Sequence, residues 1–151
     1  MTKISAFFWF AYVVALALMV GKISFFSFFI APTVHRELEK NQAVKLLRVL
    51  FPKYYKLGIV CAIIALICAP ILAQRTEIHR IACWTIPWAL ILLSEVYCLK
   101  VLVPIIEATR EGRSAGDPES TRKWECSHKL SVRLNALNLL LGLGLIGWYV
   151  A

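Results

Sequence analysis

Two charged residues stand inside long apolar stretches and are the first candidates for chemistry. Lys22 lies ten residues before Pro32, and Glu95 lies nine residues before Pro104. If both stretches are membrane-spanning helices, a rise of about 1.5 Å per residue places both charges roughly 14 Å from the same membrane surface. An unpaired charge at mid-bilayer costs about 2.5–3.5 kcal/mol, so we expect a Lys22–Glu95 ion pair. The alternative is that Lys22 extends to the surface and Glu95 is protonated.

A polar stripe runs along the last apolar stretch of the chain. At about 100° per residue, one helical face carries His128, Ser131, Asn135, Asn138 and Gly142. Amide side chains are costly against lipid, so this face should contact other helices or a ligand. Arg133 falls roughly opposite; it either extends to the headgroups or turns into the protein and joins Glu95.

Histidine, cysteine and serine residues suggest further chemistry, but weakly. His35 and His128 are expected near one membrane surface, where two histidines from different helices could bind haem iron or a metal ion. Their more ordinary role is to cap a helix or bond a carbonyl. Cys126 and His128 diverge on a helix, which disfavours a metal pair. No serine has a base partner beyond the adjacent His128, so we do not expect an enzyme.

The composition is that of a polytopic helical membrane protein. The chain has 151 residues, of which 60% are hydrophobic, and a mean hydropathy of +0.70. The net charge is +8. The basic residues flank apolar runs and form no basic groove, so we expect a lipid bilayer and no nucleic acid as partner. We predict an all-α fold: one transmembrane domain over residues 1–151, a four-helix bundle with spans at about 4–31, 53–73, 81–104 and 126–150.

The connections between the spans have their own patterns. The amphipathic segment from His35 to Phe51 predicts a short interfacial helix in the headgroup plane, or else an ordinary helix that packs on its neighbours. Tyr54 and Tyr55 follow it, and their side chains suit the membrane interface. Asp117 can cap a helix that begins at Pro118, so the last helix is expected to start before it reaches the lipid.

Basic residues gather in two of the connections. These are Arg36, Lys40, Lys45, Arg48, Lys53 and Lys56 between spans 1 and 2, and Arg110, Arg113, Arg122 and Lys123 between spans 3 and 4, against Lys3, Arg75 and Arg80 on the opposite side. The positive-inside rule places both long loops in the cytoplasm and both termini on the other side. We therefore predict an integral protein of the bacterial inner membrane.

Several motifs, in order along most of the chain, resemble the transmembrane protein 205-like family, which includes bacterial proteins labelled domain of unknown function 4149. They are Ala31-Pro32 after an aromatic run, Leu50-Phe51-Pro52-x-Tyr54-Tyr55, Tyr97 with Pro104 and Arg110, and His128-x-x-Ser131-x-x-x-Asn135-x-x-Asn138 followed by Gly142. The resemblance implies a four-span bundle and little chemistry. More distantly, the fold type is similar to that of copper-resistance and haem-binding membrane proteins, an analogy that favours haem or metal handling.

Three functions follow from these observations. The first is a non-enzymatic membrane protein that packs against other membrane helices, as an accessory subunit or a homo-oligomer. The second is a haem- or metal-binding protein that uses His128, and His35 with it. The third is a small transporter or proton-coupled carrier built around Lys22, Glu95 and the Asn135–Asn138 face, although the chain has no inverted repeat. The sequence favours the first.

Overall fold

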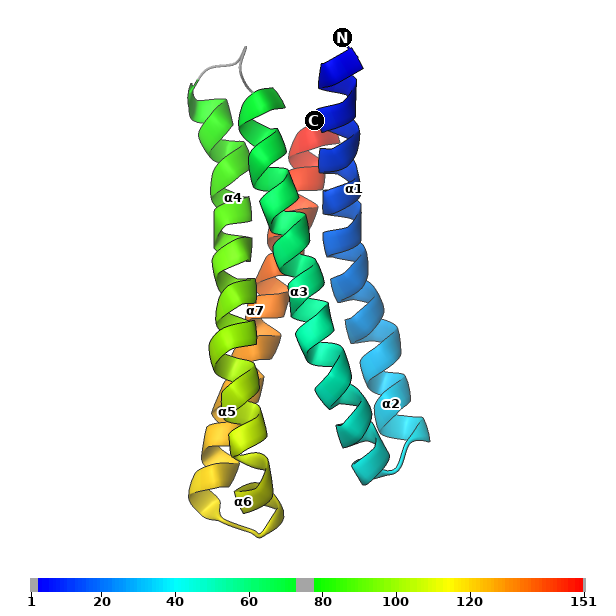
Figure 1. Ribbon diagram of the computed structural model, residues 1–151, viewed down its shortest axis with the longest axis vertical. Coiled ribbons are helices and arrows are strands. Elements are labelled where there is room, and N and C mark those ends of the chain that lie inside the picture. The colour runs from blue at the N-terminus through cyan, green and yellow to red at the C-terminus, as the bar shows by residue number, and fades with distance from the viewer. Residues whose placement is uncertain (1–2, 73–77, 151) are drawn as a thin grey trace.

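Helices form nearly all of the described structure, and the long ones run antiparallel. The computed structural model describes residues 3–72 and 78–150. Along the chain these form α1 (Lys3–Phe25), η1 (Phe26–Ile30), α2 (Ala31–Glu37), α3 (Lys40–Leu72), α4 (Ile78–Tyr97), η2 (Cys98–Leu102), α5 (Val103–Ala108), α6 (Arg110–Ser114) and α7 (Pro118–Val150). Both ends of the chain lie at one end of the bundle (Figure 1). The predicted all-α four-helix bundle is confirmed.

Within the described residues, four continuous helical stretches are long and apolar enough to cross a bilayer. They are Lys3–Glu37, Asn41–Leu72, Ala82–Ser114 and Pro118–Trp148. The chain is therefore a membrane protein, because such helices satisfy their own backbone groups in lipid. At its loop end, each stretch extends beyond the span predicted from hydropathy, because a helix need not end where the lipid does. The predicted second-span end at Ala73 and the basic residue Arg75 lie outside the described residues.

The first and third spans each contain one π-helical turn. In η1 the Ala31 N–H bonds to the Phe26 carbonyl, and in η2 the Val103 N–H bonds to the Cys98 carbonyl, so both bonds reach back five residues. A proline follows each turn, Pro32 and Pro104. A proline ring clashes with the carbonyl four residues earlier, and a wider turn relieves that clash.

The predicted interfacial helix between spans 1 and 2 is wrong as a separate element. Its residues are divided between α2, which ends at Glu37, and the first turns of α3, which continues unbroken to Leu72. Pro52 removes one backbone hydrogen bond but does not end the helix. Ala43, before the proline, is 5% exposed, and Tyr55, after it, is 2% exposed, so α3 packs against its neighbours on both sides of Pro52.

The last span begins where the capping pattern predicts. Asp117 accepts hydrogen bonds from the backbone N–H of Ser120 at 2.8 Å and of Glu119 at 3.4 Å, and α7 begins at Pro118. The bonds from Ser120 lower the pKa of Asp117 below its ordinary value. This cap therefore stabilises the start of α7 above that ordinary pKa, and the stabilisation is lost as the pH falls through the lowered value.

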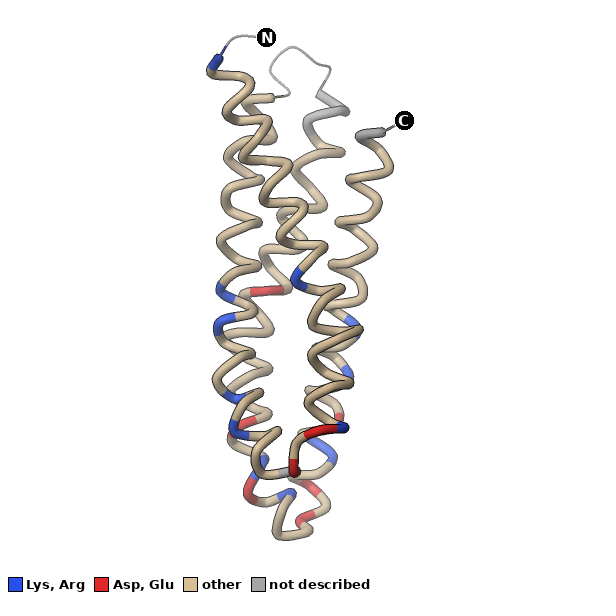
Figure 2. Tube along the Cα trace, turned by 90° about the vertical axis from the view of Figure 1, so that its right-hand side faces the viewer, with Lys and Arg blue, Asp and Glu red and all other residues tan. Residues whose placement is uncertain are grey.

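The tightest packing lies in the half of the bundle that holds the termini. Alanines on one face of α3 are fully buried, so α1 and α4 approach α3 closely. Trp88 of α4 is also fully buried, and its indole N–H donates to the Tyr12 hydroxyl at 3.1 Å. The opposite end carries most of the lysine, arginine, aspartate and glutamate residues (Figure 2). The bundle is thus closed and apolar at one end, and charged at the other.

Candidate functional site

The two intramembrane charges meet in the middle of the bundle. The Lys22 ammonium lies 2.8 Å from both carboxylate oxygens of Glu95, and the two side chains are 5% and 0% exposed. The ammonium also lies 3.4 Å from the Tyr54 carbonyl oxygen and 4.0 Å from the centre of the Tyr54 ring. A buried ammonium needs such partners because it has lost its water, and α3 and α4 supply them to this residue of α1.

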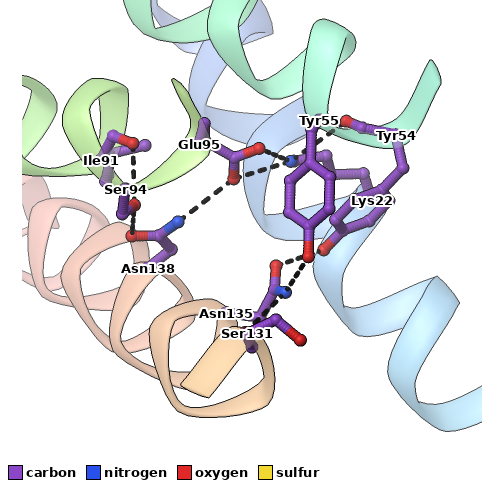
Figure 3. Close-up of polar contacts among 9 residues, drawn as sticks. All are labelled: Lys22, Tyr54, Tyr55, Ile91, Ser94, Glu95, Ser131, Asn135 and Asn138. Atoms are coloured by element: carbon purple, nitrogen blue, oxygen red, sulfur yellow. Dashed lines mark hydrogen bonds and ion pairs between the residues drawn. The ribbon is translucent and has the colours of Figure 1, made fainter. Parts of the chain in front are cut away.

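The polar stripe of α7 completes the surroundings of Glu95. The Asn138 amide donates to one Glu95 oxygen at 3.1 Å, and its own oxygen accepts from the Ser94 hydroxyl at 2.8 Å (Figure 3). The carboxylate is therefore held by a cation on one side and an amide on the other. Among the described residues, no buried side-chain nitrogen or oxygen lacks a hydrogen-bond partner. A network in which every member is bonded is rigid, and a loss at one member is felt by the others.

A second polar group lies one helical turn away, nearer the loops. The Tyr54 hydroxyl donates to the Asn135 oxygen at 2.8 Å, and the Asn135 amide donates to the Tyr55 hydroxyl at 3.3 Å (Figure 3). The same amide lies 3.0 Å from the Ser131 carbonyl oxygen. Both tyrosines therefore face the interior of the bundle, and their place at the membrane interface stays a prediction. Their hydroxyls find partners inside the bundle, which removes the need for water.

Gly58 of α3 lies directly beside the ion pair, and sequence reasoning missed it. A Cβ atom at this position would overlap the Glu95 carboxylate and the Lys22 ammonium. A pattern of small residues in the sequence could have identified it, because Gly58, Ala62, Ala65 and Ala69 recur at helical spacing on one face of α3. The missing side chain makes the room in which the two charges meet.

A cavity of about 830 Å³ occupies the half of the bundle nearer the loops. Tyr54, Tyr55 and Asn135 line its inner end, so they form a polar floor with the ion pair directly behind it. Its walls are mostly apolar and include Phe26, Val44, Leu47, Leu102, Ile106 and Leu139. Its rim, at the loop end, holds His35, Arg48, Glu107, Arg110, Arg113, Trp124 and His128. The volume and the few polar groups are typical of a small-molecule site.

The remaining predicted site residues are spread over the rim and the outer surface. His35 of α2 is exposed, while His128 of α7 is half-buried and stacks on Trp124, with ring centres 4.9 Å apart. Both line the cavity. Arg133 is exposed on the outside of α7, and the bonds to Glu95 come from Lys22 and Asn138 instead. No group of three or more His, Cys, Asp or Glu residues in the described ranges could hold a metal ion.

The fold and the site define a class of protein: a small four-helix membrane protein with a buried ion pair at mid-bundle and a cavity on its loop side. The chain belongs to the family described as Domain of unknown function (DUF4149), whose model matches residues 14–115. This region contains Lys22, Gly58 and Glu95, but not the polar stripe of α7. The wider transmembrane protein 205-like relation stays a prediction.

One curated relative matches part of the chain. A protein of Aquifex aeolicus (strain VF5), described as an uncharacterized protein, is 43% identical over 51 residues. These residues are 34% of this chain and 39% of that protein, so the match spans less than half of either chain. No solved structure matches the chain, and the predicted similarity to copper-resistance and haem-binding proteins stays untested.

Proposed function

We propose that the protein binds a small molecule in the loop-side cavity and acts as a small membrane carrier. The observation that supports this most directly is the polarity of the cavity along its length. It has a charged rim, apolar walls and a polar floor, and it stops where the Lys22–Glu95 pair begins. Beyond the pair, the bundle is tightly packed as far as the termini. A site that is accessible from one side and closed on the other is what a carrier needs in one of its states.

The proposed setting is the bacterial inner membrane, with both long loops in the cytoplasm. Two observations support it: the surplus of lysine and arginine at the loop end and the bacterial origin of the curated relative. In this orientation the cavity receives its ligand from the cytoplasmic half of the membrane.

Small molecules that remain bound after gentle purification test this proposal. The protein is taken from its own membrane in mild detergent, and extracts are compared by mass spectrometry for wild type and for Ala43→Trp. Ala43 is buried and lines the cavity, so the indole should fill part of it. The control Ala17→Trp adds the same side chain on an exposed position of α1. We expect a compound present in wild type and Ala17→Trp but depleted in Ala43→Trp. Equal contents in all three would refute the proposal.

Haem binding is the second candidate, because His35 and His128 line the same cavity from different helices. A Soret band in the purified protein that disappears in His128→Ala would support it. A colourless preparation from cells grown with ample iron would reject it.

The accessory-subunit or homo-oligomer function favoured by sequence also stays a proposal. The exposed apolar side chains are distributed over all four long helices, as lipid contact requires, and they single out no docking face. Comigration with a larger complex in mild detergent would support this function, whereas a monomer in the intact membrane would count against it.

A further inference from the structure

The cavity opens sideways between two helical segments. Phe28 of η1 and Val132 of α7 both line it, and the two residues are 68% and 54% exposed. Within the described residues, η1 and α2 make no close approach to α7, although α1 and α7 do pack together nearer the termini. A gap between two membrane spans that is flanked by exposed apolar side chains faces hydrocarbon.

The rim of the cavity carries an excess of positive charge. Arg48 and Arg110 both bind Glu107, at 3.0 and 2.9 Å, so one carboxylate is shared by two guanidinium groups. The guanidinium of Arg113 lies 3.6 Å from the centre of the Trp124 ring, a contact that leaves its charge unneutralised. Arginine presents planar N–H donors that suit phosphate and carboxylate oxygens. The rim is therefore suited to an anionic group.

The charged rim, the apolar walls and the polar floor of the cavity follow one another from the loop end to the middle of the bundle. A soluble anion would fit the arginines but would leave the apolar walls and the sideways opening without a role. A neutral lipid would fit the walls but would leave the charge of Arg113 unneutralised and the two other arginines sharing one carboxylate. An amphiphile with an anionic head and a hydrocarbon chain satisfies both sets of groups.

We propose that the cavity takes up an anionic phospholipid from the adjoining leaflet through the opening between η1–α2 and α7. The phosphate lies at the arginines of the rim, and an acyl chain runs along the apolar walls toward Tyr54, Tyr55 and Asn135. This inference rests on the proposed function and names its ligand class.

Native mass spectrometry of the full chain tests the headgroup. Delipidated protein in detergent is mixed with equal amounts of phosphatidylglycerol, phosphatidylcholine and oleate, and the retained molecules are identified. We expect wild type to retain phosphatidylglycerol in preference to the other two. Arg113→Gln should reduce that retention by about tenfold, which corresponds to about 1.4 kcal/mol, because it removes a charged hydrogen-bond donor to the phosphate. The control Arg122→Gln, at an exposed arginine of α7 outside the cavity lining, should retain as much as wild type.

A second pair of variants tests the opening. Val132→Trp should narrow it and reduce uptake of phosphatidylglycerol, whereas Leu140→Trp, at an exposed α7 position outside the cavity lining, should not. Gel filtration and circular dichroism verify that each variant is folded. Preference for phosphatidylcholine or oleate, or retention that neither Arg113→Gln nor Val132→Trp reduces, overturns the inference. If the compound depleted in Ala43→Trp is not an anionic phospholipid, the lipid inference fails while the proposed function stands. If wild type and Ala43→Trp carry the same content, both fail.

Discussion

Glu95 is the residue whose surroundings are most demanding, because a carboxylate deep in a membrane bundle has no water to stabilise it. Its two oxygens are shared between the Lys22 ammonium and the Asn138 amide, and its side chain is 0% exposed. A buried pair of this kind contributes little net stability compared with apolar residues, yet the loss of one partner is costly. The pair is therefore best tested by removing its members singly and together.

A double-mutant cycle at the ion pair should show strong coupling. Glu95→Gln strands a buried ammonium and Lys22→Met strands a carboxylate, and we expect each to reduce the free energy of unfolding by about 3–5 kcal/mol. The double variant should lose much less than the sum of the two, because it leaves no uncompensated charge. Unfolding in mixed micelles with increasing sodium dodecyl sulfate, followed by circular dichroism, measures all four proteins. Additive losses would mean that the two side chains do not interact.

Gly58→Ala should be destabilising although it adds a single methyl group. The new Cβ overlaps both charged groups, so either the helices separate or the pair breaks, and we expect a loss of about 1–3 kcal/mol. Gly21→Ala is the matched control, since no atom lies within 4 Å of a Cβ at that helical position. The control should be neutral or slightly stabilising, because alanine favours helix. Equal effects of the two substitutions in the same micelle titration would contradict the role given to Gly58.

At the scale of elements, the two π-helical turns shape the loop-side half of the molecule. Each lies between a residue of the ion pair and a proline. The helical rotation of the first and third spans therefore shifts directly after the polar network, on its loop side. Phe26 of η1 and Leu102 of η2 both line the cavity. The wider turns thus form part of the wall of the cavity.

A one-residue deletion should distinguish η2 from an ordinary helical turn. A turn that bonds five residues back holds one residue more than an α-helical turn, so deletion of Val101 can convert it into an α-turn without rotating either flank. Deletion of Leu93, within α4, must instead rotate the flanks by about 100° relative to each other and disrupt the contacts of Glu95. We expect folded, monodisperse protein from the first deletion and aggregated protein from the second, as judged by gel filtration. Aggregation of both would argue against this account of η2.

At the scale of the whole molecule, the bundle is polarised along its axis. The termini end is closed by apolar and aromatic packing, and the loop end carries the cavity and most of the charge. The interior of the loop-side half is open to small molecules, while packing closes the interior of the other half. This asymmetry is the physical basis of the proposed carrier function.

The proposed orientation of the bundle in the membrane rests on its charge and can be tested by fusion reporters. We expect alkaline phosphatase, which is active only outside the cytoplasm, to be active when fused after Ala151. Green fluorescent protein inserted next to Gly116, in the loop between α6 and α7, should fluoresce in the cytoplasm. The reverse pattern would show that the positive-inside rule fails for this chain and that the cavity faces the other side.

The sequence by itself determined the helical class, the approximate positions of the four spans, the inward face of α7 and the start of that helix at Pro118. These follow from local quantities: apolar run length, helical period and capping chemistry. The equal depths of Lys22 and Glu95 also made their pairing foreseeable, because a lone charge in lipid is costly. The family match shows which family the chain belongs to and adds nothing about the chemistry of its site.

Only the tertiary structure decided which neighbours each residue meets. The continuity of α3 through Pro52, the burial of Tyr54 and Tyr55, the exposure of Arg133 and the closeness of Gly58 to the ion pair depend on how the helices cross and rotate. The cavity is likewise a property of the space between helices, and two π-helical turns shape it. Helical period fixes which residues share a face, but packing against the other three helices fixes what that face touches.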